Sequence, residues 1–145
     1  MGTAIRGDVR AFIEARRVGR LGTVDGAGRP HVVPVCFAVD GDVVYVAVDE
    51  KPKAGDPRRL RRIRNIEAEP QVQLLFDAYD DADWSRLRFA QLRGRARIVE
   101  GGEEHARALG LLRGRYAQYR AMALESRPVI AVDVERVVAW RADAT

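Results

Sequence analysis

A run of hairpin-linked strand signals near the start of the chain constrains the fold most. Residues 20–24, 31–39 and 43–48 are each dominated by apolar and β-branched residues. They are separated by Asp-Gly-Ala-Gly and by Asp-Gly-Asp, both typical of tight turns. Closing such strands into a barrel removes the exposed edges that an open sheet would leave. The sequence therefore predicts a mainly β fold arranged as a barrel.

The second of these strands, HVVPVCFAV at 31–39, is apolar almost throughout instead of alternating. A strand of this kind is covered on both faces. In a small barrel the inner face belongs to the core, so the outer face needs a helix, a cofactor ring or a partner subunit. Pro34 cannot donate a hydrogen bond to a neighbouring strand. It predicts an edge or a local break in pairing, which leaves a place for a ligand.

The rest of the chain adds helices and further strands. Asp56 and Pro57 are expected as the N-cap and first residue of the second helix. The phase of apolar residues slips near Ala90, which predicts a β-bulge there. The expected helices are 5–17, 57–68 and 102–122, and the expected later strands are 71–79, 86–99 and 129–140, the last as one strand or a pair.

Composition limits the class of protein. The 145 residues, 47% of them hydrophobic, predict one domain over residues 1–145 with a real core. No apolar run is long enough to span a bilayer, and residues 1–10 lack the apolar core of a signal peptide. We therefore expect a cytoplasmic protein without a membrane partner. The single cysteine, Cys36, excludes an intramolecular disulfide and a cysteine-rich metal site.

The net charge is +4, and almost all of the positive side chains are arginines. Lys51 and Lys53 are the only lysines. Acidic and basic residues are interspersed along the chain, so nucleic-acid binding is a minor possibility. The lysine pair, next to an expected helix start, predicts a site for a phosphate or carboxylate. The arginines that follow are interpreted as a solvated helix face. They are Arg58, Arg59, Arg61, Arg62 and Arg64.

No side-chain constellation predicts catalysis by the chain itself. His31 and His105 lack the spacing of metal ligands, so no metal is expected. Cys36 lies mid-strand and is expected to be a buried small apolar residue. The acidic segment at 77–83 lacks the glycine and the glutamate of a calcium loop. We expect that the chemistry of an enzyme of this sequence is carried by a cofactor.

Three stretches resemble one known family, the flavin/deazaflavin oxidoreductases of the pyridoxamine 5′-phosphate oxidase-like split barrel. They are GRLGTVDGAGRPHVVPVCF, VVYVAVDEKPK and LRRIRNIEAEPQVQLLF. The KPK loop, the Asp83-Trp84 segment and the helix with Tyr116 and Tyr119 resemble the actinobacterial branch proposed to use the deazaflavin coenzyme F420. The resemblance covers nearly the whole chain.

The resemblance implies a six-stranded split β-barrel that forms a homodimer, with two cofactor sites at the subunit interface. The cofactor ring would lie on one group of residues and its phosphate on another. The ring group is Val33, Pro34, Val35 and Cys36, with Val46 and Ala47 on the neighbouring strand. The phosphate group is Lys51 and Lys53, with Arg58, Arg59 and Arg62 nearby.

The resemblance also implies hydride transfer between reduced coenzyme F420 and a small unsaturated or quinone-like acceptor. Flavin-using relatives commonly carry an arginine and then a lysine on the second strand, whereas residues 33–38 contain no base. This difference favours the deazaflavin over FMN. Trp84 and Tyr79 are candidates for the acceptor wall, and no catalytic acid is assigned. The alternatives are an FMN-binding reductase or oxidase and a non-catalytic carrier of a cofactor or haem.

Overall fold

The computed structural model describes residues 4–49, 55–56 and 59–142. In this part of the chain, seven antiparallel strands form one sheet in the order β2-β1-β5-β6-β7-β4-β3. The strands are β1 Gly19–Val24, β2 Pro30–Val35, β3 Phe37–Asp40, β4 Val43–Ala47, β5 Gln71–Ala78, β6 Arg88–Val99 and β7 Val129–Arg141. The helices are α1 Gly7–Glu14, α2 Arg61–Ala68 and α3 Gly102–Arg115, with short 3-10 helices η2 Trp84–Arg86 and η3 Ala117–Ala121.

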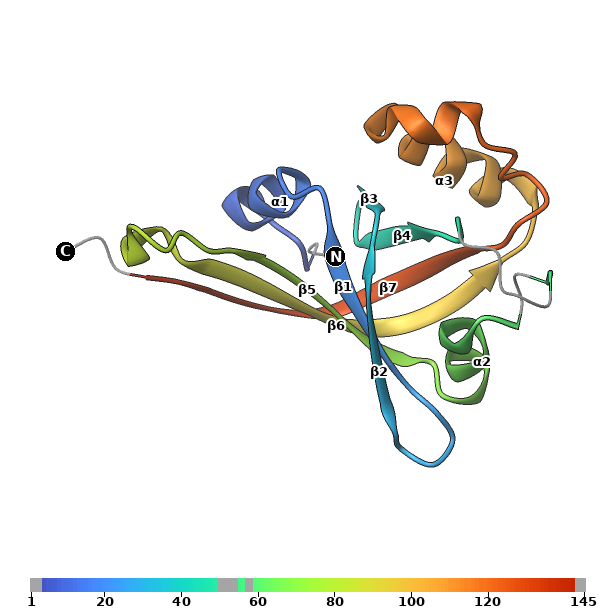
Figure 1. Cartoon of the computed structure of the whole chain (residues 1–145), viewed down its shortest axis with the longest axis horizontal. Helices are drawn as coiled ribbons and strands as arrows, with labels where there is room; N and C mark the ends of the chain where they lie inside the picture. The colour runs from blue at the N-terminus through green and yellow to red at the C-terminus, as the bar shows by residue number, and fades with distance from the viewer. Residues whose placement is uncertain (1–3, 50–54, 57–58, 143–145) are drawn as a thin grey trace.

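The sheet is strongly curled, because β2 and β3 lie at its opposite edges and yet follow each other in the chain. Only Cys36 separates them, so the chain crosses from one edge to the other at a single residue. Figure 1 shows the resulting half-barrel, with β2 continuing directly into β3. The mainly β, split-barrel prediction is confirmed.

The expectation of one continuous strand over 31–39 is wrong, because the strand divides at Cys36. This division gives seven strands in the described part instead of the expected six. The predicted break in pairing does occur, but two residues after Pro34, which still pairs with Arg20 of β1. The backbone freed at the break is satisfied by side chains: Phe37 donates its N–H to the Tyr116 hydroxyl, and Arg115 donates to the Phe37 carbonyl.

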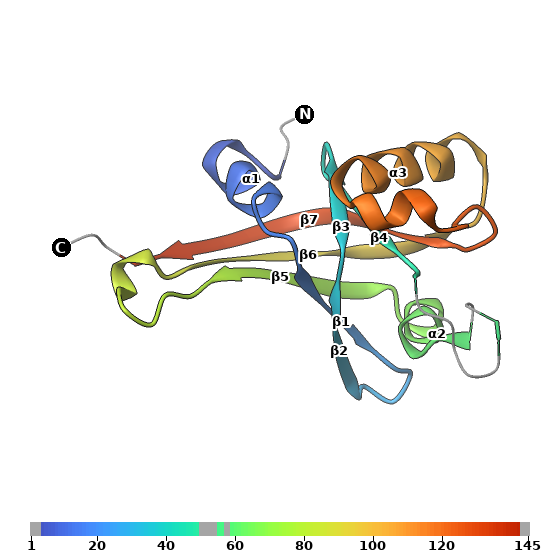
Figure 2. The ribbon, with the colours of Figure 1, turned by 45° about the horizontal axis from the view of Figure 1, so that its top comes forward.

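The interior of the curl is filled by alternate side chains of the strands and by α1 and α2. Phe37, Phe76 and Leu92 are among the fully buried side chains. A second apolar cluster lies under α3, where Tyr45 and Leu112 are buried. Figure 2 shows α1 and α3 on the same side of the sheet. The outer face of β2 is not covered by the chain itself, since Val32 is 64% exposed, so the expectation of cover on both faces is not met within one chain.

The β-bulge lies elsewhere than expected. Burial alternates regularly through Ala90, Leu92 and Gly94 of β6, so the strand keeps its phase across Ala90. The irregularity occurs between Arg93 and Gly94, where Glu135 of β7 has no partner in the register. The apolar pattern misled because Phe89 stacks on Trp140 instead of facing the core.

The helices are shorter than expected, at 7–14, 61–68 and 102–115. α2 begins at Arg61 after Leu60, and the predicted N-cap at Asp56 is wrong. The Asp56 carbonyl instead accepts the N–H of Arg59, and Pro57, the predicted first helical residue, lies outside the described residues. Residues 129–141 form one strand, not a pair. None of the helices in the described ranges is long and apolar enough to cross a membrane.

Candidate functional site

A hollow of about 220 Å³ opens where β2 passes into β3. We call it the strand-break pocket. Its lining residues are Val18, Pro34, Val35, Cys36, Ala47, Asp49 and Arg62. Five of these belong to the predicted cofactor site, namely Pro34, Val35, Cys36, Ala47 and Arg62. The structure therefore gathers residues from β2, β4 and α2 around the crossing between the sheet edges.

The chemistry of this pocket combines apolar walls with two charged groups. Arg62 is only 5% exposed, although α2 carries other arginines that point to solvent. A buried guanidinium keeps its charge and can hold a planar anionic group with two parallel hydrogen bonds. Asp49, two residues after the end of β4, adds a carboxylate to the same wall. The pocket is thus suited to a flat apolar ligand with a polar or anionic edge.

The other predicted site residues do not line this pocket. Val46 is fully buried in the core, because neighbouring residues of β4 point to opposite faces and Ala47 takes the pocket side. Val33 is partly buried against the same core. Arg59 is exposed. Lys51, Lys53 and Arg58 lie outside the described residues, so their proposed contact with a phosphate stays a prediction.

A second hollow of about 470 Å³ shares Cys36 and Asp49 with the first. We call it the tyrosine pocket. It is lined by Arg17, Cys36, Asp49, Tyr116, Ala117, Gln118, Tyr119 and Met122. The two hollows adjoin at Cys36 and Asp49, and together they fall within the volume range of small-molecule sites.

Tyr119 and Asp49 form the polar centre of the tyrosine pocket. The Tyr119 hydroxyl donates to Oδ2 of Asp49 at 2.5 Å. Burial, followed by this hydrogen bond, raises the pKa of Tyr119, so its proton is retained at neutral pH. Sequence reasoning missed Asp49 altogether, since an acid at the end of a strand has no distinctive spacing. The sequence placed Tyr119 on the apolar stripe of a helix. Its buried position was predicted correctly, but its hydrogen bond to Asp49 could not be predicted.

The wall at Cys36 is held by the end of α3. Arg115 donates to three carbonyl oxygens, those of Phe37 at 2.8 Å, Glu14 at 2.9 Å and Arg16 at 2.7 Å. The Tyr116 hydroxyl accepts the N–H of Phe37 at 3.1 Å and donates to the Arg17 carbonyl at 2.9 Å. These bonds join α1, β3 and α3 at one point, so the strand break is a fixed feature of the fold.

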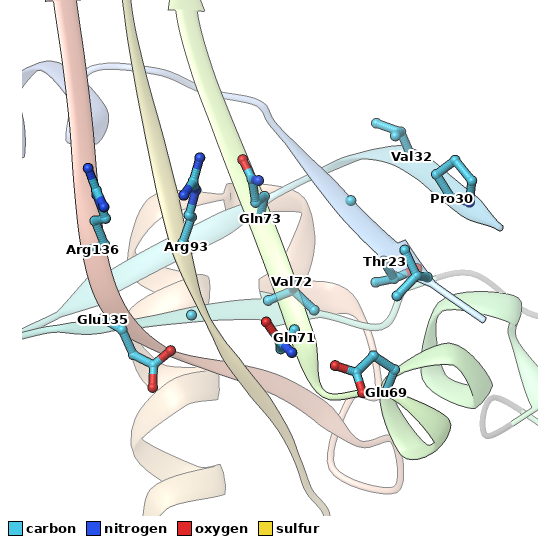
Figure 3. A pocket seen from close by; sticks show the side chains of 13 residues that line it. Thr23, Pro30, Val32, Glu69, Gln71, Val72, Gln73, Arg93, Glu135 and Arg136 are labelled. Carbon is cyan, nitrogen blue, oxygen red and sulfur yellow. The ribbon is translucent and has the colours of Figure 1, made fainter. Parts of the chain in front are cut away.

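A larger hollow of about 580 Å³ lies on the outer face of the sheet, where β1, β2, β5, β6 and β7 meet. Figure 3 shows Gln73, Arg93 and Arg136 side by side across three of these strands. Its lining includes none of the predicted cofactor residues. Val32, with its 64% exposed side chain, forms part of its rim.

Other candidates from the sequence are not brought to the strand-break pocket. His105 is buried, with Nε2 at 2.7 Å from the Arg127 carbonyl oxygen, which fits a structural role. The described residues contain no group of three side chains placed to hold a metal ion. Tyr79 and Trp84 are 63% and 65% exposed and do not line the pocket within one chain. Cys36 is half-buried and lines both hollows, so the expectation of a fully buried core cysteine is wrong.

Solved structures with the same fold include a heme binding protein from Mycobacterium smegmatis. It superposes with a TM-score of 0.75 at 20% identity, over 94% of this chain and 53% of that one. A FAD-binding protein from Mesorhizobium loti superposes with a TM-score of 0.67 at 21% identity, over 90% of this chain and 89% of that one. At these identities the likeness concerns the fold alone.

A curated relative is the 5a,11a-dehydrotetracycline/5a,11a-dehydrooxytetracycline reductase of Streptomyces rimosus, 30% identical over 94 residues. The match covers 64% of this chain and 63% of the relative, so the chain spans less than two thirds of that protein's length. The model of the family described as pyridoxamine 5′-phosphate oxidase matches residues 5–141. With this match across nearly the whole curled sheet, the chain belongs to the pyridoxamine 5′-phosphate oxidase family.

Proposed function

We propose that this protein is an oxidoreductase that binds a flavin-type cofactor, coenzyme F420, and passes a hydride to a small unsaturated or quinone-like acceptor. The observation that carries the proposal is the strand-break pocket, where Pro34, Cys36 and Arg62 meet at the crossing between β2 and β3. Family membership supports redox cofactor binding. The printed name of the Streptomyces relative supports a reductase.

The residues of the strand-break pocket fit such a cofactor. Val35 and Ala47 offer apolar surface for a ring, and Pro34 has no N–H that a ring would leave unsatisfied. Arg62 supplies a buried positive charge for a polar ring edge or a phosphate. Lys51 and Lys53, with Arg58 and Arg59, remain our proposed contacts to the phosphate.

In this proposal the bound deazaflavin supplies the hydride, and the protein binds and orients it and excludes water. The tyrosine pocket adjoins the strand-break pocket through Cys36 and Asp49, which makes it the place for the acceptor. The Tyr119 hydroxyl donates its only proton to Asp49, and the pair lines the place of the acceptor as a fixed polar group.

We also propose that the working form is a homodimer. On β1, β2 and β5, directly paired residues share a face, so Pro34 lies on the same outer face as Leu75, which is 37% exposed. Val32 lies on this face too, opposite Gly22. A second copy laid on this apolar surface would border the strand-break pocket at Pro34 and cover the outer side of β2.

Two other ligands remain alternatives. FMN would use the same apolar walls, and its binding would make the purified protein yellow. A haem carrier would need an axial ligand, and Cys36 is the sole described histidine or cysteine that lines the strand-break pocket. Because a heme binding protein has the same fold, haem is included among the ligands to be tested.

The experiment is a titration of the purified protein with coenzyme F420, FMN and haemin in parallel. Cofactor fluorescence follows the first two ligands, and the Soret absorbance follows haemin. We expect saturable binding of coenzyme F420, followed by turnover with enone and quinone acceptors. Tight haemin binding without F420 or FMN binding would show that the protein is a carrier and not an enzyme. The absence of saturable binding to any of the three ligands would refute the proposal.

A further inference from the structure

A fourth hollow, of about 310 Å³, lies between α2 and the turn that joins β1 to β2. We call it the hairpin pocket. Its lining residues are Asp25, Gly26, Ala27, Arg29, Arg61, Arg64, Asn65 and Ala68. Figures 1 and 2 both show α2 beside this hairpin. Neither the family match nor the fold neighbours explain why three arginines converge here.

Helix α2 separates this hollow from the strand-break pocket. Residues 61, 64, 65 and 68 recur at three- and four-residue spacing, so they share one face of the helix. Arg62 points from another face into the strand-break pocket. Adjacent residues of one helix therefore serve two neighbouring hollows, and a ligand that extends over α2 could occupy both.

The floor of the hairpin pocket is rigid. Asn65 is 3% exposed and Thr23 is 2% exposed. The Asn65 amide donates from Nδ2 to Oγ1 of Thr23 at 3.0 Å. This buried bond ties the helix to β1, so the arginines project from a fixed base.

The one acidic side chain in the hollow is already engaged. Asp25 accepts from the backbone N–H groups of Ala27 and Arg29 and from Nε of Arg29. The Arg29 bonds, backbone first, lower the pKa of Asp25 to about 2, so it stays charged and paired. Neither Arg61 nor Arg64 forms an ion pair with another residue of the described ranges. The described lining of the hollow thus carries more positive than negative charge.

We infer that the hairpin pocket binds a multiply charged anionic chain, and that this chain is the tail of the ligand whose ring occupies the strand-break pocket. The first half of this inference rests on Arg29, Arg61 and Arg64 alone, and the second half also rests on the proposed function. A tail with several carboxylates could extend over α2 and pair with more than one of these arginines. The hairpin pocket therefore selects for a cofactor with a long polyanionic tail.

The first arm of the test uses inorganic tripolyphosphate and the full chain, by isothermal titration calorimetry. The variant Arg61→Ser/Arg64→Ser removes the two unpaired charges. The matched control Arg95→Ser/Arg141→Ser removes two exposed arginines of β6 and β7. We expect the Kd to rise roughly tenfold in the first variant, equivalent to about 1.4 kcal/mol, and to stay unchanged in the control. Equal affinity in the two variants would overturn the site.

The second arm compares coenzyme F420, which carries an oligoglutamyl tail, with its tail-less deazaflavin riboside. The Arg61→Ser/Arg64→Ser substitutions should weaken the binding of the intact coenzyme and leave the binding of the riboside unchanged. If riboside and coenzyme bind equally well to the wild type, the tail assignment fails and the proposed function stands. If neither binds, the proposed function and the tail assignment fail together, while the tripolyphosphate titration still decides whether the hairpin pocket is an anion site.

Discussion

Gly94 shows how a single residue sets the shape of the sheet. It lies in β6 opposite the irregular register at Glu135, where the β7 backbone bends toward it. A Cβ atom added at Gly94 would overlap the backbone carbonyl of Asp133, which cannot rotate away. Only glycine therefore allows the close approach of the two strands at this point.

We predict that Gly94→Ala lowers the free energy of unfolding by about 2–3 kcal/mol, because the two backbones must separate. Gly110→Ala is the matched control, since a Cβ at this position of α3 meets nothing within 4 Å. It should raise the stability by about 0.5–1 kcal/mol through its helix preference. Denaturant titration of the wild type and the two variants measures both changes in the free energy of unfolding. A Gly94→Ala protein as stable as wild type would contradict the account of the bulge.

At the residue scale, the sequence predicted five of the residues that line the strand-break pocket. Pro34 and Cys36 could be found because a proline in an apolar strand marks a break. Asp49 could not be found, because its role depends on a hydroxyl 70 positions away in the chain. Val46 does not line the pocket, because the phase of β4 relative to the core follows from its pairing with β3 and β7 and not from its sequence.

At the scale of elements, α3 is joined to the sheet by one network of charges. Glu104 accepts two hydrogen bonds from Arg97 of β6, at 2.9 and 3.0 Å, and one from the Tyr45 hydroxyl of β4, at 2.8 Å. Arg97 also pairs with Asp133 of β7. The bonds from Arg97, and then that from Tyr45, lower the pKa of Glu104 from 4.5 to about 2.

The sign of the pH dependence follows from this lowered pKa. The contribution of Glu104 to stability is complete above its unfolded pKa near 4.5 and is lost as the pH falls toward 2. Glu104→Gln should therefore lower the free energy of unfolding by about 1–2 kcal/mol at pH 7, because the network is partly exposed. The loss should be clearly smaller at pH 3. Glu103→Gln, on the exposed side of the same helix turn, is the control. An equal loss at both pH values would contradict the assignment.

The elements themselves were largely predictable from the sequence, and their ends were not. Turn residues located the hairpins at 25–28 and 40–42 correctly. The division at Cys36 is enforced by Arg115 and Tyr116, which are distant in the chain and bond to the backbone of Phe37. α2 likewise starts late, at Arg61, although Asp-Pro is a favourable local start. At Cys36 these tertiary contacts override a local signal.

At the scale of the whole molecule, the open outer face of the sheet predicts association. Val32 is 64% exposed on β2 and lines the hollow of about 580 Å³ on the outer face of the sheet (Figure 3). We predict a dimer in sedimentation equilibrium, and a shift to monomer for Val32→Asp, because the charge would be buried against the second copy. Ala106→Asp, on the exposed side of α3, should remain dimeric. A wild-type protein that sediments as a monomer would refute the arrangement.

The proposed dimer could not be predicted from the sequence except through the resemblance. An apolar run such as HVVPVCFAV predicts that something covers the strand, and a helix or a ligand would satisfy the pattern as well as a partner. In the structure neither α1 nor α3 covers the outer face of β2, because both helices lie on the other side of the sheet (Figure 2). A ligand or a partner therefore remains as the cover.

The central claim, that a redox cofactor lies against the break between β2 and β3, can be tested through the single cysteine. Cys36 is half-buried in the wall shared by the strand-break and tyrosine pockets. The measurement is the rate at which a fluorescent maleimide labels the native protein, with Cys36→Ser as the unlabelled control. We predict that saturating coenzyme F420 slows labelling at least tenfold. An unchanged labelling rate at a coenzyme concentration that saturates binding would show that the cofactor lies elsewhere.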